Sequence, residues 1–156
     1  MAQRKYWTQG LRFSCQNCGH CCSFPGGHVY GSNKEFKRIA NYLNISFDTF
    51  IKNFTEVVDG YISLASPDGG ACVFYDKGCS IYSVRPSQCC SYPFWKDILK
   101  TDRRWAAESK TCRGIGQGKN WTKKEIEHQI NSRVINLMQV EKVQDERDGK
   151  SPGRSF

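Results

Sequence analysis

The chain has 156 residues, a formal net charge of +8 and a hydrophobic content of 38%, which is low for a globular domain. This length predicts one domain, and no segment approaches the ~18 consecutive apolar residues that a membrane helix needs. The amino terminus carries basic residues with no apolar stretch after them, so it lacks the pattern of a signal peptide. We therefore expect a cytoplasmic protein with reduced thiols and no membrane partner.

Residues 1–12 read as an N-terminal lead-in whose Tyr6, Trp7 and Leu11 can pack onto the domain. The first cysteine block, SCQNCGHCCS, follows directly and ends in a turn-rich loop. It places four thiols within eight positions: Cys15, Cys18, Cys21 and Cys22.

Two short helices are predicted after this loop. In NKEFKRIANYL the apolar residues recur at helical spacing, and Asn33 is the expected N-cap. NISFDTFIKNF predicts a second helix, capped by Ser46, with Phe50 and Ile51 among its inward residues. Both helices read as scaffold.

Short strands are predicted next, over residues 61–65 and 71–75, separated by the turn signal SPDGG. Residues 79–82 are expected to pair with residues 71–75 as a hairpin. With a four-residue loop, Cys72 and Cys79 share one face, whereas a three-residue loop separates them.

The carboxyl-terminal part begins with the glycine-rich GIGQG, residues 114–118. We expect this segment to form a tight turn, and an anion-binding site is the less favoured alternative. Thr122 and Glu125 then form a capping box that opens a helix reaching about residue 141. Its apolar stripe consists of Ile126, Ile130, Val134 and Leu137. The last residues, DERDGKSPGRSF, have little apolar content, and residues 142–156 are expected to be disordered.

Nine cysteines in a reduced compartment favour a metal or iron–sulfur site. A disulfide framework is disfavoured because the number is odd and two pairs are adjacent, Cys21-Cys22 and Cys89-Cys90. The spacing Cys15-x2-Cys18-x2-Cys21 matches three ligands of a bacterial [4Fe–4S] run, so an iron–sulfur cluster is favoured over zinc, and zinc stays open. In extended backbone, adjacent cysteines point to opposite sides, which indicates two centres or a spare thiol.

The cysteine pattern also carries a resemblance. CxxCGxCC, C-x-FYD…C-x-IY-x-x-RP-x-x-C-x-x-YPFW and C-x-GIG-x-G, from Phe13 to about Ile126, resemble a cysteine-cluster family described as zinc- or iron-chelating. Proteins described as flagellin N-methylases are similar to it. The resemblance implies eight metal ligands, and it leaves Cys90 as the spare thiol. These ligands are Cys15, Cys18, Cys21, Cys22, Cys72, Cys79, Cys89 and Cys112.

Other features are read mainly as support for this site. His20 and His28 are weaker ligand candidates than the thiols, and Arg85 is placed to donate to a thiolate or carboxylate. The aromatic residues of the second block are read as an apolar shell around the centre. The basic segment 96–124, with Trp105 and Trp121, permits nucleic-acid binding, but no nucleic-acid fold accompanies it.

Together these observations predict a small, loop-rich, metal-stabilised α+β domain with short strands, two short helices and a C-terminal helix. Residues 13–121 form the cysteine-cluster domain, and residues 122–141 form the helix packed on it. The expected function is metal binding at one or two cysteine-ligated centres, with no assigned reaction or partner. Two alternatives stay open: an iron–sulfur redox enzyme or S-adenosylmethionine-dependent lysine N-methyltransferase, and a zinc-stabilised module for nucleic acid or a protein partner.

Overall fold

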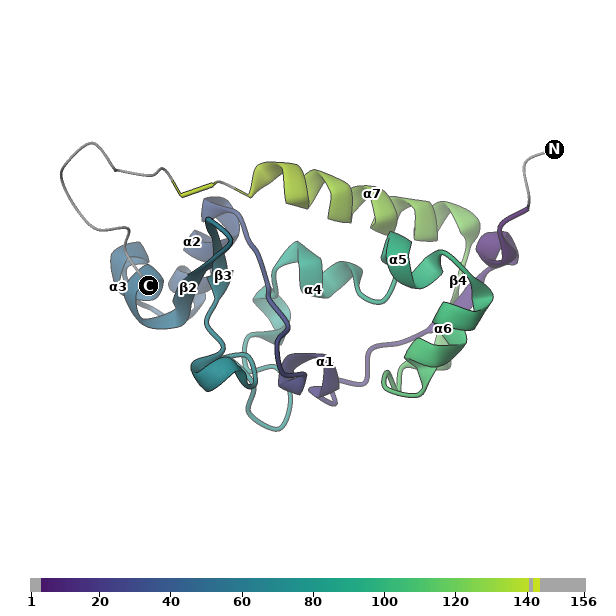
Figure 1. The fold of residues 1–156 in the computed structure, drawn as a ribbon, viewed down its shortest axis with the longest axis horizontal. Coiled ribbons are helices and arrows are strands. Elements are labelled where there is room, and N and C mark those ends of the chain that lie inside the picture. Colours follow the sequence, from purple (N-terminus) through teal and green to yellow (C-terminus); the bar gives the residue numbers. More distant parts are fainter. Residues whose placement is uncertain (1–3, 141, 144–156) are drawn as a thin grey trace.

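The computed structural model describes residues 4–140 and 142–143 and has the expected α+β composition (Figure 1). The first elements are η1 (Tyr6–Gln9), β1 (Leu11–Phe13), α1 (His20–Ser23), α2 (Asn33–Tyr42), α3 (Phe47–Phe54), β2 (Thr55–Val58) and β3 (Tyr61–Leu64). They are followed by η2 (Pro67–Gly69), η3 (Tyr82–Val84), α4 (Ser87–Ser91), α5 (Lys96–Leu99), α6 (Asp102–Ser109), β4 (Ile115–Trp121) and α7 (Lys123–Gln139). Among the described residues, no helix combines the length and apolar content that crossing a bilayer requires.

One hydrophobic cluster lies at the end of the molecule formed by α2, α3, β2 and β3 (Figure 1). Phe36 and Phe50 are fully buried there, as the helical spacing predicts. The ring of Phe74 stacks on Phe54 at 5.2 Å between centroids, which fastens the second cysteine block to this cluster. Burial of these aromatic rings is the main contribution to its stability.

The N-terminal caps of α2 and α3 follow from short polar side chains. Ser46 caps α3 as predicted, with its hydroxyl accepting the Thr49 amide. For α2 the predicted cap, Asn33, is wrong by one residue. Ser32 is the N-cap because it forms a capping box with Glu35, in which each side chain accepts a backbone amide of the other residue.

The strand predicted at residues 61–65 is confirmed as β3. It pairs antiparallel with β2 through a two-residue turn whose Asp59 and Gly60 both have positive φ. Asp-Gly between apolar runs is a strong hairpin signal, whereas the strand predicted at residues 71–75 is wrong. Those residues form turns, and the hairpin to residues 79–82 is reduced to an isolated bridge between Tyr75 and Cys79.

The opposite end of the molecule holds a second hydrophobic cluster around Trp7, Phe13 and Phe94. The predicted packing of the lead-in is confirmed, since Trp7 is only 3% exposed. All of GIGQG except Gly114 lies in strand β4, which pairs antiparallel with β1. The expected tight turn is present at the start of this strand: the Gly114 carbonyl accepts the Gln117 amide at 3.2 Å, Gly116 and Gly118 have positive φ, and the register shifts between Arg12 and Phe13. Gly114 and Gly118 permit this pairing because a Cβ at either position would collide with Ser14.

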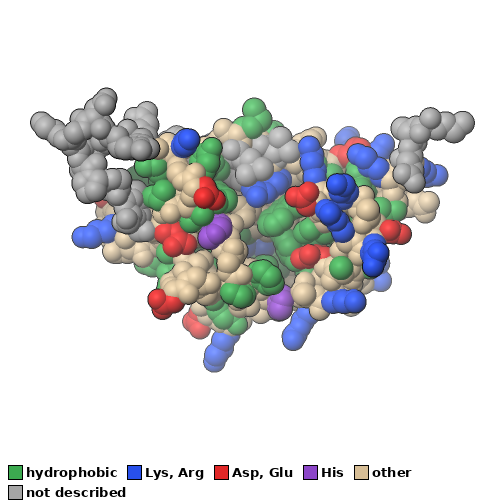
Figure 2. Space-filling view, in the orientation of Figure 1, with side chains coloured by type: hydrophobic (Ala, Val, Ile, Leu, Met, Phe, Trp, Pro, Cys, Tyr) green, Lys and Arg blue, Asp and Glu red, His purple; other side chains and the backbone are tan. Residues whose placement is uncertain are grey.

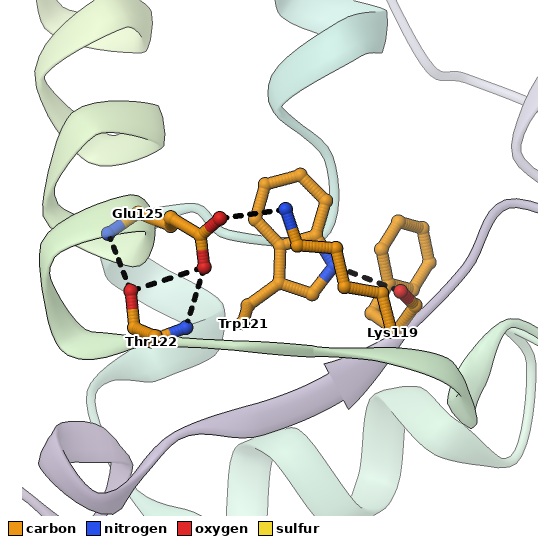
Figure 3. Close-up of polar contacts among 5 residues, drawn as sticks. Lys119, Trp121, Thr122 and Glu125 are labelled. Atoms are coloured by element: carbon orange, nitrogen blue, oxygen red, sulfur yellow. Dashed lines mark hydrogen bonds and ion pairs between the residues drawn. The ribbon is translucent and has the colours of Figure 1, made fainter.

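Helix α7 runs along the molecule over α5 and α4 (Figure 1). Its predicted capping box between Thr122 and Glu125 is confirmed (Figure 3). Glu125 Oε1 also lies 2.6 Å from Lys119 Nζ, and this ammonium group lies above the Trp121 ring. Of the predicted stripe, Ile126 is fully buried and Ile130 packs on the second cluster. The side chains of Val134 and Leu137, and residues 144–156, lie outside the described part of the chain.

Candidate metal centre

The first cysteine block reaches α1 through a glycine. Gly19 has φ 73°, and a Cβ there would lie 2.4 Å from the Tyr75 ring, so only glycine fits this position. The Gly19 carbonyl accepts the amides of Cys22 and Ser23 and closes one helical turn. Cys21 and Cys22 therefore lie in a helix, and the expectation based on extended backbone does not hold here.

Two hydrogen bonds join the first block to the second. The Cys72 amide donates to the Cys22 carbonyl at 2.7 Å, and the Cys79 amide donates to Asn17 Oδ1 at 3.0 Å. The bridge between Tyr75 and Cys79 encloses a loop of three residues, 76–78. This is the loop length that was expected to place Cys72 and Cys79 on opposite faces. Burial raises the pKa of Cys72, and the charge of Cys79 adds to this effect, so the two thiols interact despite the short loop.

The thiols of Cys21, Cys22 and Cys79 interact directly. Hydrogen bonding with Cys22 lowers the pKa of Cys21 to about 7 and that of Cys79 to about 6. The same contacts, first with Cys21 and then with Cys79, raise the pKa of Cys22. The Cys22 proton thus lies between two groups with thiolate character, because three adjacent thiolates would repel one another.

Cys89 adds a further thiol to this group. It lies in α4, and burial raises its pKa, followed by the charges of Cys21, Cys72 and Cys79. We define the thiol cluster as Cys21 and Cys79 together with the three cysteines whose pKa is raised by the charges of both, which are Cys22, Cys72 and Cys89.

Helix α4 is held in place by two buried side chains that the sequence analysis did not identify. Glu35 Oε1 accepts the Ser87 amide at 2.7 Å, at the start of α4. Gln88 accepts the Tyr30 amide and donates to the His28 carbonyl at 2.6 Å, which ties the loop before α2 to α4. The S-x-x-E spacing of SNKE signals Glu35 as a capping residue, whereas no local pattern signals Gln88.

The remaining predicted ligands lie around the thiol cluster. Cys15 Sγ lies 3.8 Å from Arg85 Nη1, as expected for a donor to a thiolate, and Arg85 stacks on Tyr82. Cys112 lies beside Tyr92, and the charge of Cys21 contributes to raising its pKa after the larger effect of burial. Cys18 is half-buried, and the contacts above do not include it.

Cys90 follows Cys89 in α4, and its charge contributes to raising the pKa of Cys89 after the larger effect of burial. The exposed Cys90 thiol donates to the Arg85 carbonyl at 3.6 Å. Of the histidines, His20 is exposed, and the His28 ring packs against Tyr30 at 6.2 Å between centroids. Trp105 and Trp121 are partly buried and pack against the second hydrophobic cluster, which limits the ring surface that bases could stack on.

The donor chemistry of the thiol cluster fits a thiophilic metal. Sulfur ligands select zinc, copper(I) or iron–sulfur centres, and metal binding requires thiolates. The lowered pKa values of Cys21 and Cys79 provide them near neutral pH. Among the described residues, no three or more His, Cys, Asp or Glu side chains already have the arrangement of a metal-ion site.

Comparison with known proteins agrees with this chemistry. Residues 14–113 match the CxxCxxCC family, whose description is "Putative zinc- or iron-chelating domain". An uncharacterized protein of Methanocaldococcus jannaschii is 36% identical over 91 residues, which cover 56% of this chain and 48% of that protein. The chain therefore spans about half the length of this relative. No solved structure matches the chain at a significant level.

Proposed function

We propose that this chain, which belongs to the CxxCxxCC family of zinc- or iron-chelating domains, binds a metal centre through thiolates of the cluster. The proposal is carried by interactions between the two cysteine blocks. Cys22 hydrogen-bonds to both Cys21 and Cys79, and the charges of Cys21 and Cys79 raise the pKa values of Cys72 and Cys89 in addition to burial. Cysteines this far apart in the sequence come close only when the tertiary structure brings their segments together.

Electrostatics support the proposal. The Cys22 pKa is raised because a third thiolate beside Cys21 and Cys79 would meet uncompensated negative charge. A bound cation removes that penalty, since it replaces the proton and favours the thiolate form of all three side chains. Arg85 adds a fixed positive charge beside Cys15. Metal binding at the cluster should therefore release protons.

Hydrogen bonds from neighbouring residues hold the candidate ligands in position. Glu35 and Gln88 orient α4, and with it Cys89. Tyr92 donates a short hydrogen bond to Glu108 and contacts Cys112 as well, which restrains that thiol. A bound centre would supply Lewis-acid chemistry if it is zinc, or electron-transfer chemistry if it is an iron–sulfur cluster.

We favour an iron–sulfur cluster because of the Cys15-x2-Cys18-x2-Cys21 spacing, and a [4Fe–4S] cluster in particular. The eight family cysteines outnumber the four ligands of one centre, so a second centre involving Cys15, Cys18 or Cys112 is part of the proposal. The alternatives differ in the metal they need. An iron–sulfur redox or methyl-transfer enzyme needs the cluster, whereas a zinc-stabilised binding module needs zinc.

The test is anaerobic purification followed by metal and sulfide analysis and a visible spectrum. A brown protein with iron and sulfide would support the cluster, and a colourless zinc protein would support the zinc alternative. Cys79→Ser should lose most of the bound metal, whereas Cys90→Ser is the matched control and should retain it. Wild-type protein without zinc or iron, or equal metal loss in both variants, would contradict the proposal.

A further inference from the structure

A pocket of about 520 Å³ lies in the half of the molecule that contains the second hydrophobic cluster. Residues from η1, α5, α6 and α7 line it, and none of the cysteines does. Its volume lies within the range of about 300–1,000 Å³ that is typical of small-molecule sites. The pocket is thus separate from the candidate metal centre in both position and chemistry.

The rim of the pocket is strongly cationic. It contains four basic side chains, Arg4, Lys5, Lys96 and Lys100, and one carboxylate, Asp102. Lys and Arg gather over this part of the molecule, on the right of the face in Figure 2, where Figure 1 shows α5 and α6. One carboxylate against four cations leaves three positive charges for a ligand to neutralise, which suits a multiply charged anion better than a monocarboxylate.

The base of the pocket is apolar. Trp7 and Leu99 are 3% and 4% exposed, and both belong to the second hydrophobic cluster, onto which Ile130 packs. A cationic rim above an apolar base fits an anion that carries an organic body. Inorganic phosphate alone would leave this base uncovered.

Tyr6 is the feature that a ligand would explain. It lines the pocket, and its hydroxyl is buried with no hydrogen-bond partner among the described residues. An unsatisfied buried hydroxyl is unfavourable, so native proteins usually provide a partner. Burial and the nearby Asp102 charge raise the pKa of Tyr6 to about 12, which keeps the phenol protonated and able to donate.

Two backbone amides at the start of α6 already have side-chain acceptors. Thr101 Oγ1 accepts the Arg104 amide at 3.1 Å, and the Asp102 carboxylate accepts the Arg103 amide at 2.8 Å. An anion in this pocket would therefore be held by the side chains of the rim.

We propose that this pocket binds a small organic phosphate of about mononucleotide size. The phosphate would meet Lys96 and Lys100, the organic body would cover Leu99 and Ile130, and the Tyr6 hydroxyl would donate to the ligand after a small adjustment of the side chain. A small molecule is favoured over a nucleic-acid strand because Trp105 and Trp121 are partly buried against the second hydrophobic cluster, which limits the ring surface available for stacking bases.

Isothermal titration calorimetry on the full chain, purified anaerobically, tests this with ADP, adenosine, inorganic phosphate and a short single-stranded oligonucleotide. ADP should bind about tenfold or more tightly than adenosine or inorganic phosphate, because only ADP offers both charge and an organic body. The double variant Lys96→Ala/Lys100→Ala should weaken ADP binding by about tenfold, in line with the loss of two charge contacts.

Two controls sharpen the result. Lys34→Ala/Lys52→Ala removes the same charge from α2 and α3, at the other end of the molecule, and should leave ADP binding unchanged. Tyr6→Phe should weaken ADP binding several-fold without lowering the melting temperature, because the hydroxyl has no partner among the described residues of the free protein. Absent ADP binding, equal loss in both lysine double variants, unchanged binding by Tyr6→Phe, or binding of the oligonucleotide alone would overturn the proposal.

Discussion

Glu35 offers the sharpest test of how this fold supports its cysteines. Its carboxylate accepts hydrogen bonds from the Ser32 amide at 2.8 Å, the Ser32 hydroxyl at 3.1 Å and the Ser87 amide at 2.7 Å, and it also bonds to the Ser87 side chain. The residue is only 8% exposed, so water cannot readily replace these bonds. Glu35→Ala would leave two backbone donors without an acceptor, one at the start of α2 and one at the start of α4.

The size of the effect follows from these bonds. A hydrogen bond to a charged group contributes about 1.5–3 kcal/mol net, and such contributions within one network are not additive. We therefore expect Glu35→Ala to lower the free energy of unfolding by about 3–5 kcal/mol, a large share of the ~5–15 kcal/mol of a typical domain. Because α4 carries Cys89, metal affinity should also fall, by about tenfold.

Glu125 provides the matched control, because it forms the same capping box at the start of α7. Its carboxylate is open to solvent, where water can replace the lost contacts. Glu125→Ala should therefore destabilise the protein much less than Glu35→Ala, although its hydrogen bond to Lys119 lowers the pKa of Glu125 to about 2.

The effect of pH gives an independent check on Glu35. Burial raises the pKa of Glu35, but the hydrogen bonds from Ser32 and Ser87 outweigh it and hold the pKa below its ordinary value of 4.5. A lowered pKa stabilises the fold at pH values above 4.5, and this contribution disappears as the pH falls through the pKa of the folded protein. The difference in stability between wild type and Glu35→Ala should therefore shrink on acidification.

Urea denaturation of both variants at pH 7 and at lower pH measures these differences, with bound metal quantified in parallel. Equal destabilisation by Glu35→Ala and Glu125→Ala would refute the reasoning, because burial would then make no difference. A Glu35→Ala penalty that stays constant down to pH 3 would show that the carboxylate charge is not what stabilises the fold.

Three further predictions concern other parts of the molecule. Removal of the metal should largely unfold the chain, because a structural zinc can contribute ~10–16 kcal/mol; a native circular-dichroism spectrum and a cooperative melt without metal would contradict this. Gly19→Ala should lower the free energy of unfolding, measured by chemical denaturation, by about 1–3 kcal/mol, because Gly19 has a positive φ and a Cβ there would collide with the Tyr75 ring. Gly26 has a similar φ but open space around it, so Gly26→Ala should lower the free energy of unfolding by less. Phe50→Ala should cost about 3–5 kcal/mol and lower the melting temperature; a loss below about 1 kcal/mol would mean that the first cluster repacks freely.

Much of the local structure could be predicted from the sequence. Helices α2, α3 and α7 follow from apolar residues at helical spacing, and the caps at Ser46 and Thr122 follow from side chains that bond within three residues. The Asp59-Gly60 turn between β2 and β3 has an equally local signal, but the only hairpin predicted was the one between residues 71–75 and 79–82, which the structure reduces to an isolated bridge. That error arose because short apolar runs beside turns do not reveal their partners.

The cysteine pattern by itself determined the family and the thiol chemistry, because ligand type and spacing are properties of the chain alone. Only the tertiary structure decided which thiols meet. The cluster depends on the Cys72 amide reaching the Cys22 carbonyl and on Glu35 reaching Ser87, contacts between segments far apart in sequence. The pairing of β1 with β4 is of the same kind. Such contacts depend on how the whole chain packs, and no local spacing encodes them.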